Sequence, residues 1–186
     1  MSRLTVLTLL LILLSPVLAH SSDATQTYQT PEQYLANVFG EPPPSATLWL
    51  TGELGEAVAD TLGHKPRRIR ERYWARDNRS VWILEEIGKE RPITMAFLVD
   101  NGQLADASVL IYRESRGWEI RLPRFTRQFD GATLNEHGEL DRDIDGITGA
   151  TLSVNAMEKL ARIALLLSTE IHKGKAISSA RADDTP

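Results

Sequence analysis

The sequence contains no cysteine among its 186 residues. This absence excludes disulfide bonds, zinc held by thiolates, iron–sulfur clusters and haem attached through thioethers. It also excludes a lipid anchor that requires a cysteine. Any redox chemistry of this chain must therefore use a cofactor that is held without sulfur.

Positive charge is scarce as well. The 21 Lys and Arg residues are outnumbered by 25 Asp and Glu residues, which gives a formal net charge of −4. A nucleic-acid-binding protein normally carries a basic stripe, so nucleic acid is not expected as a partner. The four histidines show no metal-ligand spacing, and no metal site is expected. Nucleophile-elbow, P-loop and Rossmann fingerprints are also missing.

A long apolar run occurs only at the start of the chain. Arg3 precedes the run Leu4–Leu14, and small residues at Val17–Ala19 fit a signal peptidase site. Residues 1–19 are therefore expected to be a signal peptide that is cleaved after Ala19. The alternative is an uncleaved membrane anchor, but the run is short of the roughly 20 residues that a span needs. Both alternatives predict an exported protein of the periplasm or cell envelope.

The rest of the chain has the length of a single domain. Residues 20–30 are polar and are expected to form a disordered tether, residues 31–175 form the domain, and residues 176–186 form a disordered tail. A helix is predicted from Pro31 to Gly40. The stretch 48–62 is expected to be helical in part, because its glycines interrupt the pattern.

Strand signals dominate residues 67–112, which predict an antiparallel meander of about four strands. Asp100–Gly102 predicts a hairpin, since Asn-Gly tolerates the positive φ angles of tight turns. Five arginines in the first part of this region are either an anion-binding face or the solvated side of a strand, and the second interpretation is favoured. They are Arg67, Arg68, Arg70, Arg72 and Arg76.

One stretch stands out, Asp145-Gly146-Ile147-Thr148-Gly149-Ala150-Thr151-Leu152-Ser153, because it leads directly into the longest helical pattern. A glycine-bearing turn that opens a helix lets a phosphate approach the free N–H groups of the first turn. The helix is expected over Leu152–Lys173, with Gly174 as its C-cap. The predicted fold is α+β, an antiparallel β-sheet packed against this long C-terminal helix and shorter N-terminal helices.

The spacing Asp145-x-x-Thr148-Gly149-Ala150-Thr151 resembles the flavinylation motif of the FMN-binding domain family. That family includes subunits of the sodium-translocating NADH:quinone reductase and of ferredoxin-linked electron-transport complexes. In the family, the threonine after Gly-Ala carries FMN through a phosphoester bond made by a dedicated flavin transferase. The resemblance therefore implies FMN as the cofactor and Thr151 as its attachment point, with Asp145 read by the transferase or ligating its metal.

A second segment carries the same resemblance. The family has a loop of the Glu-Thr-Pro-Gly type after its central strand, and Glu114-Ser115-Arg116-Gly117 is similar to it, with Arg116 in place of proline. Phe125-x-x-Gln128-Phe129-x-Gly131 is similar to a segment that follows the loop. The resemblance implies a flavin pocket, with Trp118 as a candidate for stacking on the ring. The implied cofactor-binding residues are Asp145, Gly146, Thr148, Gly149, Ala150, Thr151, Ser153, Glu114, Ser115, Gly117 and Trp118.

The implied function is electron transfer between envelope or membrane redox proteins, as a carrier or accessory subunit rather than a stand-alone enzyme. Two alternatives remain open from the residues alone. One is a non-redox ligand-binding or sensory module with FMN bound non-covalently or absent, and the other is a scaffold without a cofactor. The motif taken by itself also fits an ordinary helix cap, in which a threonine satisfies the first-turn N–H groups.

Overall fold

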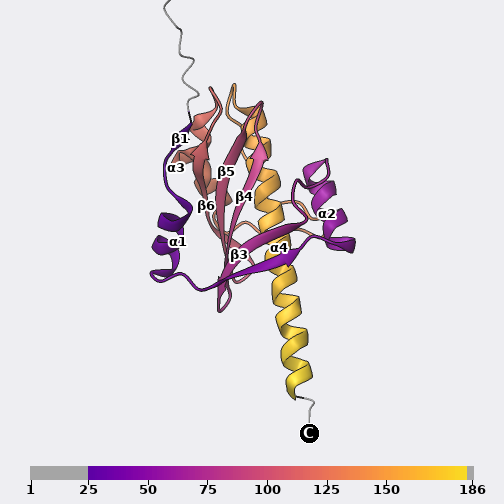
Figure 1. The fold of residues 1–186 in the computed structure, drawn as a ribbon. Coiled ribbons are helices and arrows are strands. Elements are labelled where there is room, and N and C mark those ends of the chain that lie inside the picture. The colour runs from indigo at the N-terminus through magenta and orange to yellow at the C-terminus, as the bar shows by residue number, and fades with distance from the viewer. Residues whose placement is uncertain (1–24, 184–186) are drawn as a thin grey trace, which may run out of the picture.

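A computed structural model describes residues 25–183, with side chains described up to residue 174. The predicted signal peptide lies outside the described residues. The fold is one six-stranded antiparallel sheet with helices on both faces, as Figure 1 shows. The predicted α+β class is confirmed. None of the helices within residues 25–183 is long and apolar enough to cross a membrane.

Strands β3 to β6 form the predicted meander. Their bounds are Arg70–Arg76, Arg79–Ile87, Pro92–Asp100 and Gln103–Tyr112. Asn101 and Gly102 both have positive φ angles, so the predicted Asn-Gly hairpin is confirmed. Two further strands extend the sheet to the order β1-β6-β5-β4-β3-β2, namely β1 (Gln26–Thr27) and β2 (Ser45–Trp49).

Strand β1 corrects the expectation of a disordered tether over residues 20–30. Gln26 and Thr27 pair with Tyr112 and Ile111 of β6. The sequence shows no strand signal there, because the pairing partner lies more than 80 residues away. Thr30 then closes a capping box with Gln33 and starts α1 (Pro31–Phe39), which ends at Gly40 as predicted. Residues 20–24 lie outside the described part of the chain.

The stretch 48–62 divides between two elements. Leu48 and Trp49 belong to β2, and α2 runs over Gly52–Leu62. Gly63 ends α2 in the left-handed conformation, where its N–H bonds to the carbonyls of Ala59 and Asp60. The glycines thus separate a strand from a helix, which explains the interrupted helical pattern.

Helix α4 (Thr151–Asp183) packs along one face of the sheet, next to α2. The positions of the helical pattern are buried, as the 3.6-residue period requires. They are the apolar residues Val154, Met157, Leu160, Ala161, Ala164, Leu167 and Ile171, together with the polar Ser168. A buried chain of hydrogen bonds fixes α4 to β4, since the Trp82 indole donates to Ser80 Oγ and Ser80 Oγ donates to Ser168 Oγ at 2.9 Å.

The end of α4 corrects two expectations. Gly174 is not its C-cap, and the residues up to Asp183 of the expected disordered tail 176–186 are helical. A single glycine costs a helix only about 1 kcal/mol relative to alanine, so the helix-forming residues that follow can carry it past Gly174. In Figure 1 this part of α4 extends beyond the sheet. Residues 184–186 lie outside the described part.

The opposite face of the sheet is covered by α1. Tyr34 and Leu35 pack there against Val81, Ala96 and Leu110. Short helical turns follow β6 and close the end of the sheet near the start of α4. They are η1 (Trp118–Arg121), α3 (Pro123–Thr126) and η2 (Arg127–Phe129).

Candidate functional site

The two motif segments meet in space. The loop after β6 and the first turn of α4 form opposite walls of an open hollow of about 610 Å³, and the β4–β5 turn contributes one residue. Ligand pockets in proteins typically have volumes of about 300–1,000 Å³. The hollow is lined by Lys89, Glu114, Ser115, Arg116, Gly149, Ala150, Thr151, Leu152 and Ser153.

The first turn of α4 is opened by a tight turn. The Ala150 N–H donates to the Ile147 carbonyl at 2.9 Å, and the Ala150 carbonyl accepts the first helical bond from Val154 at 3.0 Å. Gly149 has φ +83°, a left-handed conformation that side chains rarely adopt. Thr151 is thus the first helical residue, it is exposed, and the N–H groups beside it lack acceptors within the helix. A hydroxyl and free backbone donors are therefore presented together at the hollow.

Glu114 shapes the wall of the hollow. Its Oε1 accepts three backbone N–H bonds from the β4–β5 turn, from Lys89 at 2.5 Å, Glu90 at 2.6 Å and Arg91 at 2.9 Å. Burial acts to raise the pKa of Glu114, but these donors and the Lys89 charge outweigh it and hold the pKa below its ordinary value. The carboxylate therefore ties two loops together and is ionised at neutral pH.

The Ser153 side chain packs the start of α4 against the end of β6 and the loop that follows it. Its buried hydroxyl lies 3.2 Å from the Tyr112 hydroxyl, which in turn donates to the Arg116 carbonyl. A Cβ on Gly117 would lie 2.9 Å from the Tyr112 hydroxyl and 3.1 Å from Ser153 Oγ. Gly117 therefore permits a close approach of the loop to α4, and Ser153 has a packing role.

Gln128 holds the backbone of the motif from outside the hollow. Its Oε1 accepts the Asp145 N–H at 2.7 Å, and its Nε2 donates to the Asp145 carbonyl at 3.4 Å. This clamp explains why the Phe125–Gly131 segment accompanies the motif. The Asp145 carboxylate is exposed and does not line the hollow.

Replacing Gln128 with alanine is expected to loosen the approach to α4 without unfolding the domain. Loss of two exposed hydrogen bonds should cost about 0.5–1.5 kcal/mol of unfolding free energy. The Asp145 amide should exchange its hydrogen faster, which hydrogen–deuterium exchange measures. Gln103→Ala, at the exposed start of β6, serves as the control. Unchanged exchange at Asp145 would contradict the clamp.

Five of the implied cofactor-binding residues do not line the hollow: Asp145, Gly146, Thr148, Gly117 and Trp118. Trp118 starts η1, and its ring lies 5.1 Å from the Arg121 guanidinium, which also lies 4.4 Å from the Tyr28 ring. The other six implied residues, Glu114, Ser115, Gly149, Ala150, Thr151 and Ser153, come together as the resemblance implies.

Three residues of the lining were missed by the sequence reasoning: Lys89, Arg116 and Leu152. Lys89 is 62 positions before Thr151, and only the β4–β5 turn brings it to the hollow. Arg116 stands where the family pattern has proline, so its side chain had no expected role. Leu152 is large and apolar, yet it is 51% exposed. This exposure of an apolar side chain could not be predicted from the sequence alone. The two cations change the electrostatics of the hollow.

The arrangement favours an anion next to an apolar group. Thr151 and the first-turn N–H groups are donors, Lys89 and Arg116 are cations, and the nearby Glu114 carboxylate is already engaged by backbone donors. Such a set binds phosphate well, because the helix N-terminus and cations both favour negative charge. Leu152 offers an apolar surface beside it.

The match to a family model agrees with this chemistry. The family model of the FMN-binding domain matches residues 88–166, which include both walls of the hollow. Among solved structures, the chain is similar to Shewanella oneidensis NqrC, with 14% identity and a TM-score of 0.49, over 71% of this chain and 87% of that chain. The comparison with curated proteins gave no match.

FMN fits the residues that are present. Its phosphate suits the hydroxyl, the free N–H groups and the two cations, and a flavin ring could lie against Leu152. Gly149 leaves open space around its Cα, since a Cβ there would meet no atom within 4 Å. Over residues 88–166 the chain thus resembles the FMN-binding domain family, and that family indicates FMN as the cofactor.

Proposed function

We propose that this protein is an exported flavoprotein that carries FMN covalently on Thr151 and relays electrons between redox proteins of the envelope or membrane. The observation that carries the proposal is the position of Thr151. It is exposed, it is the first residue of α4, and it lines a hollow that also contains Lys89 and Arg116. FMN supplies an exchange of one or two electrons when it is bound.

The attachment requires a partner enzyme, a flavin transferase that uses FAD. Thr151 Oγ bonds to the phosphorus of the FMN half while the bond between the two phosphates of FAD breaks. AMP leaves, and the hydroxyl proton passes to a base of the transferase. The product is a phosphodiester that keeps one negative charge. The N-terminus of α4 stabilises such a charge by about 0.3–1 kcal/mol, in addition to hydrogen bonds from its N–H groups.

Export provides a physical reason for a covalent bond. Outside the cytoplasm, a cofactor that dissociates is diluted and is not replaced from a local pool. The signal peptide predicted over residues 1–19 supports this location. A carrier role follows from the openness of the hollow, which leaves the cofactor accessible to partner proteins rather than enclosed with a substrate.

Intact-mass measurement tests the attachment. The full chain is co-expressed with a flavin transferase, denatured and weighed beside Thr151→Ala and Thr47→Ala. We expect the mass of one FMN less one water on the wild type and on Thr47→Ala, and no adduct on Thr151→Ala. Thr47 is the control, since it is an exposed threonine of β2 that lies outside the motif and does not line the hollow.

Three outcomes would contradict parts of the proposal. An adduct that persists in Thr151→Ala would move the attachment elsewhere. Flavin that copurifies but is released by acid would show non-covalent binding. Attached flavin that cannot be reduced and reoxidised reversibly would exclude the carrier role. The N-terminal residue of the protein from the periplasmic fraction tests export and cleavage after Ala19.

A further inference from the structure

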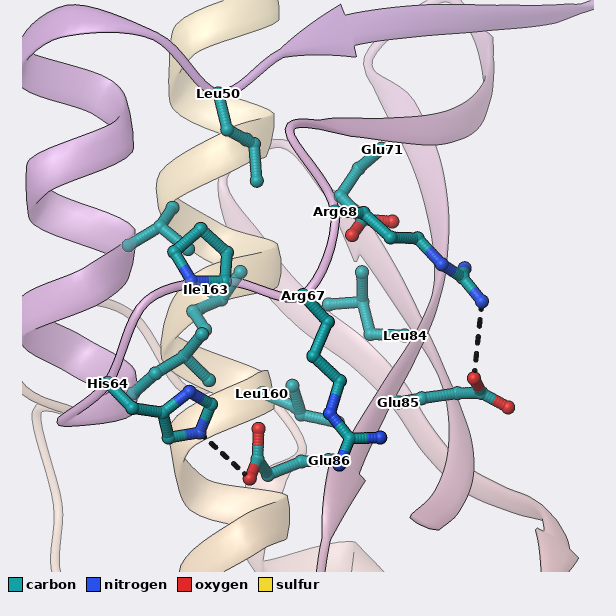
Figure 2. Close-up of a pocket in the computed structure, with 13 residues that line it drawn as sticks. Leu50, His64, Arg67, Arg68, Glu71, Leu84, Glu85, Glu86, Leu160 and Ile163 are labelled. Atoms are coloured by element: carbon teal, nitrogen blue, oxygen red, sulfur yellow. Dashed lines mark hydrogen bonds and ion pairs between the residues drawn. The ribbon is translucent and has the colours of Figure 1, made fainter.

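A second cavity shares no lining residue with the hollow. It is enclosed by α2, α4, β4 and the segment that leads into β3, and its volume is about 130 Å³. Figure 2 shows its lining. The apolar floor consists of Leu50, Val58, Leu62, Leu84, Leu160 and Ile163. Since an apolar cavity of about 150 Å³ binds benzene, this floor admits a group of similar size.

The rim of the cavity is charged, and most of its charges are paired. His64 Nε2 lies 3.2 Å from Glu86 Oε1, and the Arg68 guanidinium lies 3.3 Å from Glu85 Oε2, as the dashed lines in Figure 2 mark. Glu85 also pairs with Arg113 and accepts a hydrogen bond from the Thr94 hydroxyl. Each of these four rim side chains therefore has at least one partner. They leave Arg67 and Glu71 as the remaining charges of the rim.

Glu71 lies on the core side of β3. It stands opposite Leu48 in the β2–β3 register, and its neighbour on the same side, Tyr73, stacks on the buried Trp82. Within the described residues it has no hydrogen bond or ion pair. Burial is the main cause that raises the pKa of Glu71, and Arg68 offsets it in part. Glu71 is half-buried, so its carboxylate keeps some contact with water, and a partly desolvated carboxylate in a cleft is a candidate for a binding site.

Arg67 precedes β3 and has no ion pair or hydrogen bond within the described part of the chain. In Figure 2 the Arg67 guanidinium and the Glu71 side chain are drawn apart from each other, with Glu71 beside Arg68. Among the described residues, the cavity thus offers an exposed cation and a half-buried anion that both lack an ion pair, together with an apolar floor. A ligand that satisfies all three carries an anionic group, a cationic group and a compact apolar body.

We propose that this cavity binds a free α-amino acid with a branched aliphatic side chain, such as leucine. The ammonium group pairs with Glu71, the carboxylate pairs with Arg67, and the side chain fills the floor. A simple organic acid would face Glu71, Glu85 and Glu86 without a compensating cation of its own. A simple amine would leave Arg67 unpaired.

Isothermal titration calorimetry of the full chain with leucine tests this assignment. We expect saturable binding of leucine, and binding at least about tenfold weaker for three analogues that each lack one group. Glycine lacks the apolar side chain, isovalerate lacks the ammonium group, and 3-methylbutylamine lacks the carboxylate. The cavity does not contain Thr151, so the same result is expected in Thr151→Ala, whatever the outcome for flavin.

Substitutions of Glu71 and Arg67 show whether these residues bind leucine or only support the fold. Glu71→Gln and Arg67→Gln should each weaken leucine binding at least about tenfold. Glu71→Gln should also raise the melting temperature of the unliganded protein slightly, because it removes a half-buried charge that has no ion pair within the described residues. Arg70→Gln is the matched control, since Arg70 is exposed and lies over the Trp49 ring rather than the cavity.

Several results would overturn the proposal. Absence of leucine binding would do so directly. Equal binding of isovalerate or 3-methylbutylamine would show that one of the two charges has no role. Leucine binding that is unchanged in both Glu71→Gln and Arg67→Gln would place the amino acid elsewhere on the protein.

Discussion

Replacing Glu114 with alanine is expected to lower the unfolding free energy by about 2–4 kcal/mol. The substitution removes the acceptor of three backbone N–H groups at Lys89, Glu90 and Arg91. When these N–H donors lose a charged acceptor, they form weaker hydrogen bonds to water or remain unsatisfied. Urea unfolding followed by circular dichroism measures the effect. Because the same bonds hold Lys89 at the hollow, flavin attachment should decrease as well.

The pH dependence gives a second, independent measure of the same bonds. The folded pKa of Glu114 lies below its ordinary value of 4.5, so its ionised form stabilises the fold. This contribution is complete above the unfolded pKa and is lost as the pH falls through the folded pKa. Glu114→Gln, which keeps an acceptor without the charge, should therefore be less stable than the wild type at pH 7 and should lose less stability on acidification.

Glu136→Gln is the control for this pH profile, because the Glu136 side chain is 87% exposed. It should follow the wild type from pH 7 to pH 3. If Glu114→Gln loses as much stability on acidification as the wild type, the carboxylate has no special link to the β4–β5 turn.

The second large effect is expected at Gly117. An alanine there must adopt φ +87°, and its Cβ would lie 2.9 Å from the Tyr112 hydroxyl and 3.1 Å from Ser153 Oγ. The left-handed conformation costs about 1–2 kcal/mol and overpacking about 1–3 kcal/mol, so the sum is about 2–5 kcal/mol. Thermal unfolding measures the loss of stability.

Gly149→Ala is the matched control for Gly117→Ala. Gly149 has nearly the same backbone angle, φ +83°, but a Cβ there meets no atom within 4 Å. It should therefore lose only about 1–2 kcal/mol from the left-handed conformation. Equal losses in the two variants would show that the contact of Gly117 with Tyr112 and Ser153 is not tight.

Local patterns were sufficient to predict a large part of this fold. The buried positions of α4 follow from a helical period, and the turn at Asn101 follows from the steric freedom of Asn-Gly. The sequence also predicted that the segments around Glu114 and Thr151 belong to one site. Their meeting was inferred from a family pattern, since nothing local links two loops 37 residues apart.

Other features depend on contacts between distant segments. Thr27 becomes a strand only because β6 offers a free edge. Lys89 reaches the hollow only through the turn that Glu114 holds. Neither contact has a periodicity or spacing that a sequence could reveal. The continuation of α4 past Gly174 is different, because there a single glycine was given too much weight against the helix-forming residues around it.

The place of α4 in the chain has a consequence for timing. Helix α4 follows every other described element in the chain, and its first turn is one wall of the hollow. The hollow consequently does not exist in a nascent chain that has not yet reached α4, where earlier segments are free to fold first. A modifying enzyme that recognises the assembled hollow rather than a linear motif would act only on correctly folded copies. The cofactor would then be present only on protein molecules in which the hollow has formed.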